Sequence, residues 1–211
     1  SGVDVLHFDS DVLFSDMEGD LVVSSEFGVN AKNVEATVFE EDALVSITSD
    51  YSDINDQKIL NQTNITLEGL VSIDRLFKHF KQDPIESLTG SFNYFADLSI
   101  PSQLGEHPNL TINSDLLGFE RDMPFPLKKF KTDAEPLEIN LLLKPNQFYL
   151  NGSLALASGN TLTSELLFVD QTFSFGEVLI NQAEVLNTNI LGLNIAADLN
   201  SIKLEPWLDF I

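Results

Sequence analysis

The chain has 211 residues, with 33 acidic and 11 basic side chains, and its formal net charge is −22. Phosphate contacts need Lys and Arg, so this charge argues against nucleic-acid binding and against docking on an anionic membrane through a polybasic patch. The sequence has no cysteine, which excludes disulfide bonds and thiolate metal sites. It also has no run of 18 apolar residues, so we expect no helix that crosses a bilayer.

Alternation of apolar and polar residues is the dominant pattern from the first third of the chain to its end. It predicts strands at 20–27, 33–39, 43–49, 59–69, 92–100, 109–116, 137–143, 148–156, 161–169, 173–180 and 191–199. A period of two is typical of a sheet with one covered face and one wet face. Short turn segments at 144–147 and 158–160 favour antiparallel neighbours. A break in phase at Gly176-Glu177 predicts a β-bulge there.

One segment, residues 72–82, has the pattern of a helix. Ser72 is a good N-cap, Asp74 suits the first turn, and Pro84 stops the helix. The apolar residues of this segment share one stripe: Ile73, Leu76, Phe77 and Phe80. A second helix is predicted from residue 204 to the end, with Pro206 in its first turn.

The longest irregular stretch runs from Pro108 to Pro136 and is predicted to cross between two halves of the sheet. Because no linker composition interrupts the chain, we expect residues 1–211 to form a single continuous segment of a larger protein. Two structural repeats meeting near residues 105–135 remain an open alternative within that segment.

Residues able to carry out chemistry are scattered. His7, His79 and His107 lie far apart, and no hydrolase, P-loop or dinucleotide motif is present. The acidic groups at 9–11 and 50–56 lack the spacing of a calcium-binding loop and are interpreted as solvated turns. The sequence therefore predicts no catalytic residue, no metal site and no cofactor. The two basic clusters, Arg75 to Lys81 and Lys128 to Lys131, are interpreted as surface charge, with contact to lipid phosphate as the alternative.

Two short motifs resemble those of a known family. Ser114-Asp115-Leu116-Leu117-Gly118 is followed by Pro124-Phe125-Pro126-Leu127-Lys128, with Met123 where Leu is usual. Near the end, the stretch from Leu199 to Trp207 is similar to a recurring strand that leads into a Trp. This pattern, best over residues 109–207, resembles the YhdP family of AsmA-like envelope proteins, which are bridge-like lipid transporters of Gram-negative bacteria.

The resemblance implies a long curved β-sheet with a hydrophobic inner face, in a periplasmic protein anchored in the inner membrane outside this segment. It implies movement of phospholipid between inner and outer membranes, and no enzymatic activity. Phospholipid or fatty acyl chains would be the ligands. Other partners in the envelope are not indicated.

The fold class that we expect is all-β: a strongly twisted and curved antiparallel sheet that forms an apolar groove, with one short amphipathic helix. Two helices are too few to cover so many strands, which leaves either a groove or a sheet curled on itself. The residues expected to line the groove are Phe92, Tyr94, Phe148, Leu150, Leu154, Leu156, Leu166, Phe168, Phe173, Phe175, Leu193 and Ile195. The alternative is a β-sandwich that serves as an interaction or carbohydrate-binding module of a surface protein. Its aromatic residues would be exposed, yet 16 Phe against 3 Tyr and 1 Trp suit burial better than sugar stacking.

Overall fold

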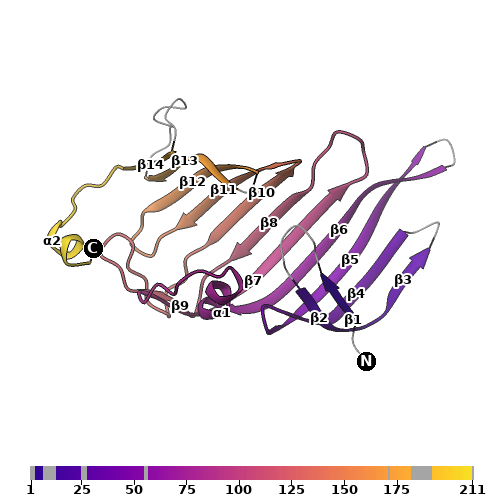
Figure 1. The fold of residues 1–211 in the computed structure, drawn as a ribbon, viewed down its shortest axis with the longest axis horizontal. Helices are drawn as coiled ribbons and strands as arrows, with labels where there is room; N and C mark the ends of the chain where they lie inside the picture. The colour runs from indigo at the N-terminus through magenta and orange to yellow at the C-terminus, as the bar shows by residue number, and fades with distance from the viewer. Residues whose placement is uncertain are drawn as a thin grey trace.

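The structure, a computed structural model, describes residues 3–6, 13–24, 28–54, 57–170, 172–181 and 192–210. These residues form one open, curved β-sheet and two short helices (Figure 1). The all-β fold predicted from the alternation is therefore confirmed. No helix within the described ranges is long and apolar enough to cross a membrane.

The strands are β1 (Val3–Leu6), β2 (Leu13–Glu18), β3 (Leu21–Ser24), β4 (Gly28–Val38), β5 (Glu41–Ile54), β6 (Gln57–Ser72), β7 (Leu88–Pro101), β8 (Asn109–Ser114), β9 (Phe119–Arg121), β10 (Leu137–Lys144), β11 (Gln147–Ala155), β12 (Thr161–Val169), β13 (Thr172–Ile180) and β14 (Gly192–Ala197). Strands β4 to β7 are longer than the alternating stretches predicted, β3, β8 and β14 are shorter, and β1, β2 and β9 were not predicted. The helices are α1 (Ile73–His79) and α2 (Glu205–Phe210). Both predicted helices are present, and Ser72 caps α1 by accepting the backbone N–H of Arg75 at 3.4 Å.

The main path of the sheet is β1-β2-β4-β5-β6-β7-β8-β10-β11-β12-β13-β14, with β3 beside β4 and β9 beside the start of β7. The pairs are antiparallel, as predicted, up to β13. The last pair, β13 with β14, is parallel, so the sheet is mixed where we expected a purely antiparallel one. Residues 182–191, between these two strands, are outside the described part of the chain.

Tight turns join the long strands. Phe39 and Glu40, between β4 and β5, both have positive φ angles of 54° and 62°. Two such residues form the two-residue turn whose twist matches that of the flanking strands. The hairpin predicted at 144–147 is also confirmed: β10 and β11 pair up to Lys144 and Gln147, and Asn146 has a φ of 60°.

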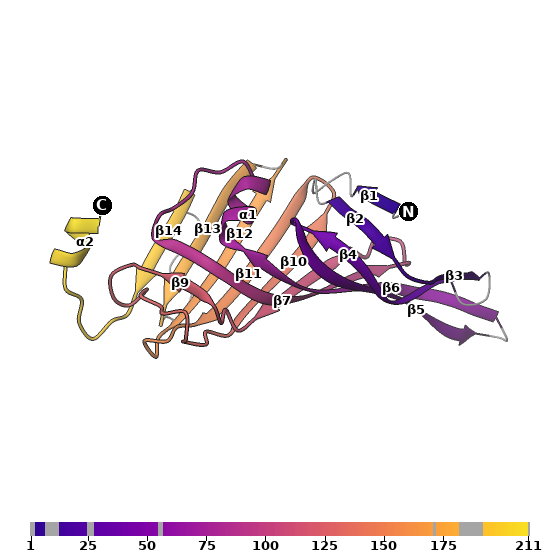
Figure 2. The same ribbon diagram turned by 90° about the horizontal axis from the view of Figure 1, so that it is seen from below.

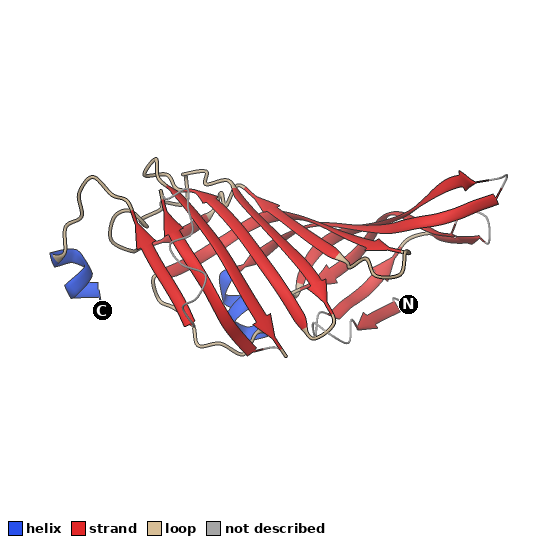
Figure 3. Ribbon diagram, turned by 90° about the horizontal axis from the view of Figure 1, so that it is seen from above, coloured by secondary structure: helices blue, strands red, loops and turns tan. Residues whose placement is uncertain are grey.

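The sheet curves around α1, and Figures 2 and 3 show this helix on the concave side of the sheet. We call the surface that faces α1 the inner face and the opposite surface the outer face. The predicted crossover begins later than expected, because β8 already starts at Asn109. Residues 115–136 leave the sheet, and β9 within them pairs with β7 at Leu88–Gly90. Gly118 is required at the start of this excursion, since its φ is 95° and a Cβ would lie 2.4 Å from the carbonyl oxygen of Ser91.

Candidate functional site: an apolar trough

The inner face is a continuous apolar surface across the sheet. Residues paired directly across neighbouring antiparallel strands point to the same side, so the register assigns each side chain to a face. One row of partners runs from β5 to β12: Ile47, Ile65, Leu98, Leu110, Leu141, Leu150 and Leu166. The next row on the outer face is polar: Thr66, Asp97, Thr111, Asn140, Asn151 and Glu165. The two faces therefore differ in polarity.

The apolar side chains of β8, β10, β11 and β12 on this face are only half-buried, although nearly all are Leu or Phe. Within the described residues, no second sheet pairs or stacks over them. Toward the end of the sheet, exposure rises to 52% at Leu193 and 69% at Ile195. A soluble protein seldom leaves a strip of this kind uncovered, so the inner face has the character of a binding surface. We call this open, apolar, curved surface the trough.

An aromatic cluster lies at one end of the strands that form the trough. Phe148 and Phe168 are direct partners, with their rings stacked at 4.3 Å and 11°. Phe173 meets Phe168 edge to face at 5.6 Å and is 38% exposed. These rings extend the leucine surface to the rim of the trough.

Ten of the twelve predicted lining residues lie on the inner face: Phe92, Tyr94, Phe148, Leu150, Leu154, Leu166, Phe168, Phe173, Leu193 and Ile195. Leu156 is different, because it follows β11 in a tight turn and is only 4% exposed. Its side chain is packed core and lines no open surface.

Phe175 was placed on the wrong face. It pairs with Leu167, while Phe173 pairs with Phe168, so the extra residue of the bulge is Ser174. The bulge therefore lies before the predicted Gly176-Glu177 position. It keeps Gly176 opposite Leu166, whose Cδ2 atom would be 2.4 Å from a Cβ at residue 176. The Leu166 side chain occupies that space, and Phe175 points to the outer face.

The lining of the trough changes toward β4 and β5. There it consists of small, buried residues: Ala31, Val34, Ala36, Ala43 and Val45. Met17, Ile47, Ile65 and Leu67 pack against this group. The half-buried part of the trough is thus confined to the strands from about β7 onward.

Helix α1 covers part of the inner face where the two parts of the trough meet. Ile73, Leu116 and Phe119 form a buried cluster, and Leu76 and Phe77 of α1 pack against it. Phe92, Leu137 and Leu154 of the inner face also pack against this cluster. We call α1, Leu116 and Phe119 together the cover.

Tyr94 lies on the inner face beside the cover. Burial raises its pKa to about 12, and its hydroxyl is buried without a hydrogen-bond partner. The side chain stands over Gly69, its partner on β6, where a Cβ would lie 3.1 Å from the hydroxyl oxygen. A phenol in this position behaves as apolar lining.

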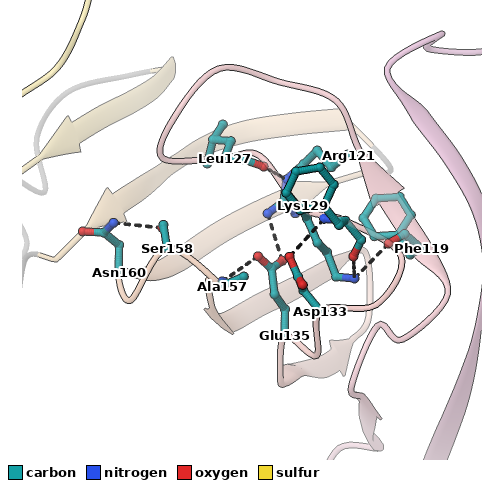
Figure 4. A network of polar contacts seen from close by, with 10 residues as sticks. Phe119, Arg121, Leu127, Lys129, Asp133, Glu135, Ala157, Ser158 and Asn160 are labelled. Carbon is teal, nitrogen blue, oxygen red and sulfur yellow. Dashed lines mark hydrogen bonds and ion pairs between the residues drawn. The ribbon is translucent and has the colours of Figure 1, made fainter.

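A buried polar network holds the excursion of residues 115–136 in place (Figure 4). Arg121 donates from Nη2 to Glu135 Oε2 at 2.9 Å, and Glu135 Oε1 accepts the backbone N–H of Ala157 at 2.7 Å. Lys129 Nζ donates to the carbonyl oxygens of Phe119 at 2.8 Å and Phe130 at 3.1 Å. The network ties the excursion to the turn after β11.

Sequence reasoning missed this network. Lys129 was interpreted as surface charge, but it is 1% exposed, and Glu135 is fully buried. Burial lowers the pKa of Lys129, and the carboxylates of Glu135 and Asp133 counter part of this effect. Lys128 does remain at the surface, paired with Asp122 at 3.0 Å. The residues around the Pro-Phe-Pro motif therefore anchor the loop that supplies the cover.

The outer face carries a separate hollow of about 1400 Å³. Glu35, Glu68 and Glu138 line it, together with Asn113 and Ser153. Leu44, Leu70 and Phe95 line it as well, but the carboxylates interrupt this apolar surface. We therefore place the candidate site on the inner face, where the apolar row is unbroken. In the described ranges, no group of His, Cys, Asp or Glu could hold a metal ion. His7, Asp9, Asp11 and Asp56 fall outside those ranges.

An open, curved sheet with an apolar inner face and a more polar outer face defines this protein as a β-trough protein. Comparison of the sequence with known families gives one match. The chain belongs to the YhdP family, whose profile, described as "YhdP protein", matches residues 6–211. No curated protein and no solved structure matches the chain.

Proposed function

We propose that this chain is a non-enzymatic, lipid-conducting segment of a periplasm-spanning protein that moves phospholipid between the inner and outer membranes. The observation that carries the proposal is the uncovered inner face, with its row of half-buried leucines from β8 to β12. Membership of the YhdP family supports it. The protein would be anchored in the inner membrane by a part outside this segment.

The dimensions of the trough suit an acyl chain. Strands β11 and β12 have nine residues each, which corresponds to roughly 30 Å across the sheet. One leaflet of a bilayer has a hydrocarbon thickness of roughly 15 Å, so an extended acyl chain fits within the trough. Each methylene group moved from water onto this surface contributes about 0.8 kcal/mol. The phosphate headgroup would stay in water at the rim.

The closed β-sandwich, which was the alternative from the sequence, needs a second layer over the inner face. The described residues form one sheet instead, and its only layer on that side is the small cover. The trough therefore remains the better interpretation.

Extraction of the purified protein with organic solvent, followed by mass spectrometry, tests the proposal. We expect phospholipid or fatty acid in stoichiometric amounts, and uptake of a fluorescent fatty acid after delipidation. Leu166→Asp should remove both, because it places a charge on the inner face. Leu167→Asp is the matched control, since the next residue of β12 points outward and is also half-buried. A lipid-free extract with no uptake by the wild-type protein would overturn the proposal.

A further inference from the structure

Helix α1 lies in the path that a lipid would take along the trough. The helix lies on the inner face at the boundary between the half-buried, leucine-lined part and the buried, alanine- and valine-lined part. Its Leu76 and Phe77 pack with Phe92, Leu137 and Leu154 through the buried cluster. An acyl chain that runs along the inner face from β12 toward β5 meets these side chains.

The connectivity allows α1 to lift without disturbing the sheet. Strands β6 and β7 pair with each other as far as Ser72 and Ser91, so residues 73–90 form the loop of a long hairpin. Only the last part of this loop, Leu88–Gly90, takes part in another strand pair, with β9. Movement of residues 73–86 therefore breaks no strand pair, while Ser87, whose carbonyl oxygen accepts the backbone N–H of Asp122 at 2.8 Å, stays in place.

Outside its apolar stripe, α1 is held by two ion pairs and one ring contact. Arg75 Nε is 3.3 Å from Glu41 Oε1 at the start of β5, and Lys78 Nζ is paired with Glu40 in the turn before it. The ring of His79 meets that of Phe39, in the same turn, edge to face at 5.0 Å. The Lys78–Glu40 pair is mostly exposed to solvent, and such pairs contribute little to stability. A helix of seven residues is also marginal on its own.

The closed position leaves one group unsatisfied. Arg75 Nη1 is buried and has no hydrogen-bond partner. Phe80 and Ile85, in and after the last turn of α1, are 56% and 47% exposed. The segment therefore combines apolar contact with the trough and an unsatisfied buried donor, which suits an element with two positions.

We propose that α1 is a gate in the trough: in the closed position it occludes the inner face at Phe92 and Leu154, and its displacement opens the path for an acyl chain. This inference rests on the proposed function, because it describes how that same trough is regulated.

The absence of cysteine in the chain makes a direct test possible. The double variant Glu40→Cys/Lys78→Cys, joined by a short bis-maleimide, fixes α1 to the β4–β5 turn. The same variant treated with a monofunctional maleimide carries modified cysteines at both positions, but no link restrains its helix. Asp122→Cys/Lys128→Cys, cross-linked in the same way, is a matched control at another surface ion pair. Arg75→Glu/Lys78→Glu places acids opposite Glu41 and Glu40 and should open the gate.

The readout is the uptake rate of fluorescent palmitate by delipidated protein, with circular dichroism to confirm folding. We expect the cross-link to α1 to slow uptake about tenfold, in proportion to the lost open population, and the charge reversal to speed it. The Asp122/Lys128 cross-link should leave the rate unchanged. Equal rates in the cross-linked and free forms of Glu40→Cys/Lys78→Cys would reject the gate and leave the trough intact. Absence of uptake in every form, including wild type, would reject the proposed function itself.

Discussion

A few buried side chains hold the excursion of residues 115–136 in place beside the sheet. The Arg121–Glu135 pair is almost completely buried, so each charge depends on its partner for compensation. Asp122–Lys128, a few residues away, is an ion pair of the same type that lies in solvent. The sequence did not distinguish these two pairs, because a Lys or Glu near prolines has the pattern of a solvated loop in either case. Burial of this kind is decided by contacts distant in sequence, such as that of Glu135 with Ala157.

Replacement of Glu135 by Gln should destabilise the protein by about 3–5 kcal/mol, since it leaves the Arg121 and Lys129 charges buried without their nearest carboxylate. Asp122→Asn removes the exposed pair and should cost about 0–1 kcal/mol. Urea unfolding followed by circular dichroism measures both changes. Similar losses in the two variants would contradict the assignment of Glu135 as the buried anchor.

Tyr94 makes the stability of the folded protein depend on pH in the alkaline range. Its pKa is about 12 in the folded protein and near its ordinary value of 10.0 in the unfolded chain. Between these values the unfolded chain loses the proton while the folded protein retains it, so stability falls as the pH rises. Tyr94→Phe should reduce this fall and, since the buried hydroxyl has no partner, should be at least as stable as wild type at pH 7. Urea titrations at pH 7, 10 and 12 test this, with Tyr149→Phe on the outer face as the control. An unchanged alkaline slope in Tyr94→Phe would contradict it.

At the scale of elements, the alternation predicted all the strands except the short β1, β2 and β9 and, for most residues, which face they share. It failed at β13 because Phe173 and Phe175 have the spacing of neighbours on one face, and because Gly176 is the more usual place for an irregularity. The observed bulge at Ser174 depends on packing between strands: Leu166 needs the space above Gly176, and Phe173 packs on Phe168. The parallel direction of β14 was missed for a related reason, since a period of two does not specify the direction of the partner strand.

The bulge creates a pair of phenylalanines suited to a test. Phe173 and Phe175 are 38% and 37% exposed but lie on opposite faces. Phe173→Asp should lower uptake of a fluorescent fatty acid by about tenfold or more, because it places a charge in the aromatic cluster of the trough. Phe175→Asp should leave uptake close to that of wild type. Equal effects of the two substitutions would contradict the assigned faces.

At the scale of the whole molecule, the sequence left a closed sandwich and an open trough unresolved, because both need strands with one apolar face. The arrangement of strands settles this point: the described residues form one curved sheet, and only the small cover lies over it. The amphipathic stripe predicted a helix packed on the sheet, but not the partners of this helix in the cover. The cover combines α1 with Leu116 and Phe119, which are about 40 residues further along the chain, and no local pattern links them.

An uncovered inner face also predicts how the stability of the whole molecule responds to its ligand. A ligand that binds only the folded protein stabilises it by about 2.7 kcal/mol at a free concentration one hundred times its Kd. For a chain of 211 residues this corresponds to an increase in Tm of about 5–10 °C. Palmitate, added below the concentration at which it self-associates, should therefore raise the Tm of delipidated protein measured by calorimetry. Leu166→Asp should lose this increase and Leu167→Asp should keep it, since the two residues differ in the face to which they point. A Tm independent of palmitate in the wild-type protein would mean that the folded state gains no contact with acyl chains, and the half-buried leucines would then require another explanation.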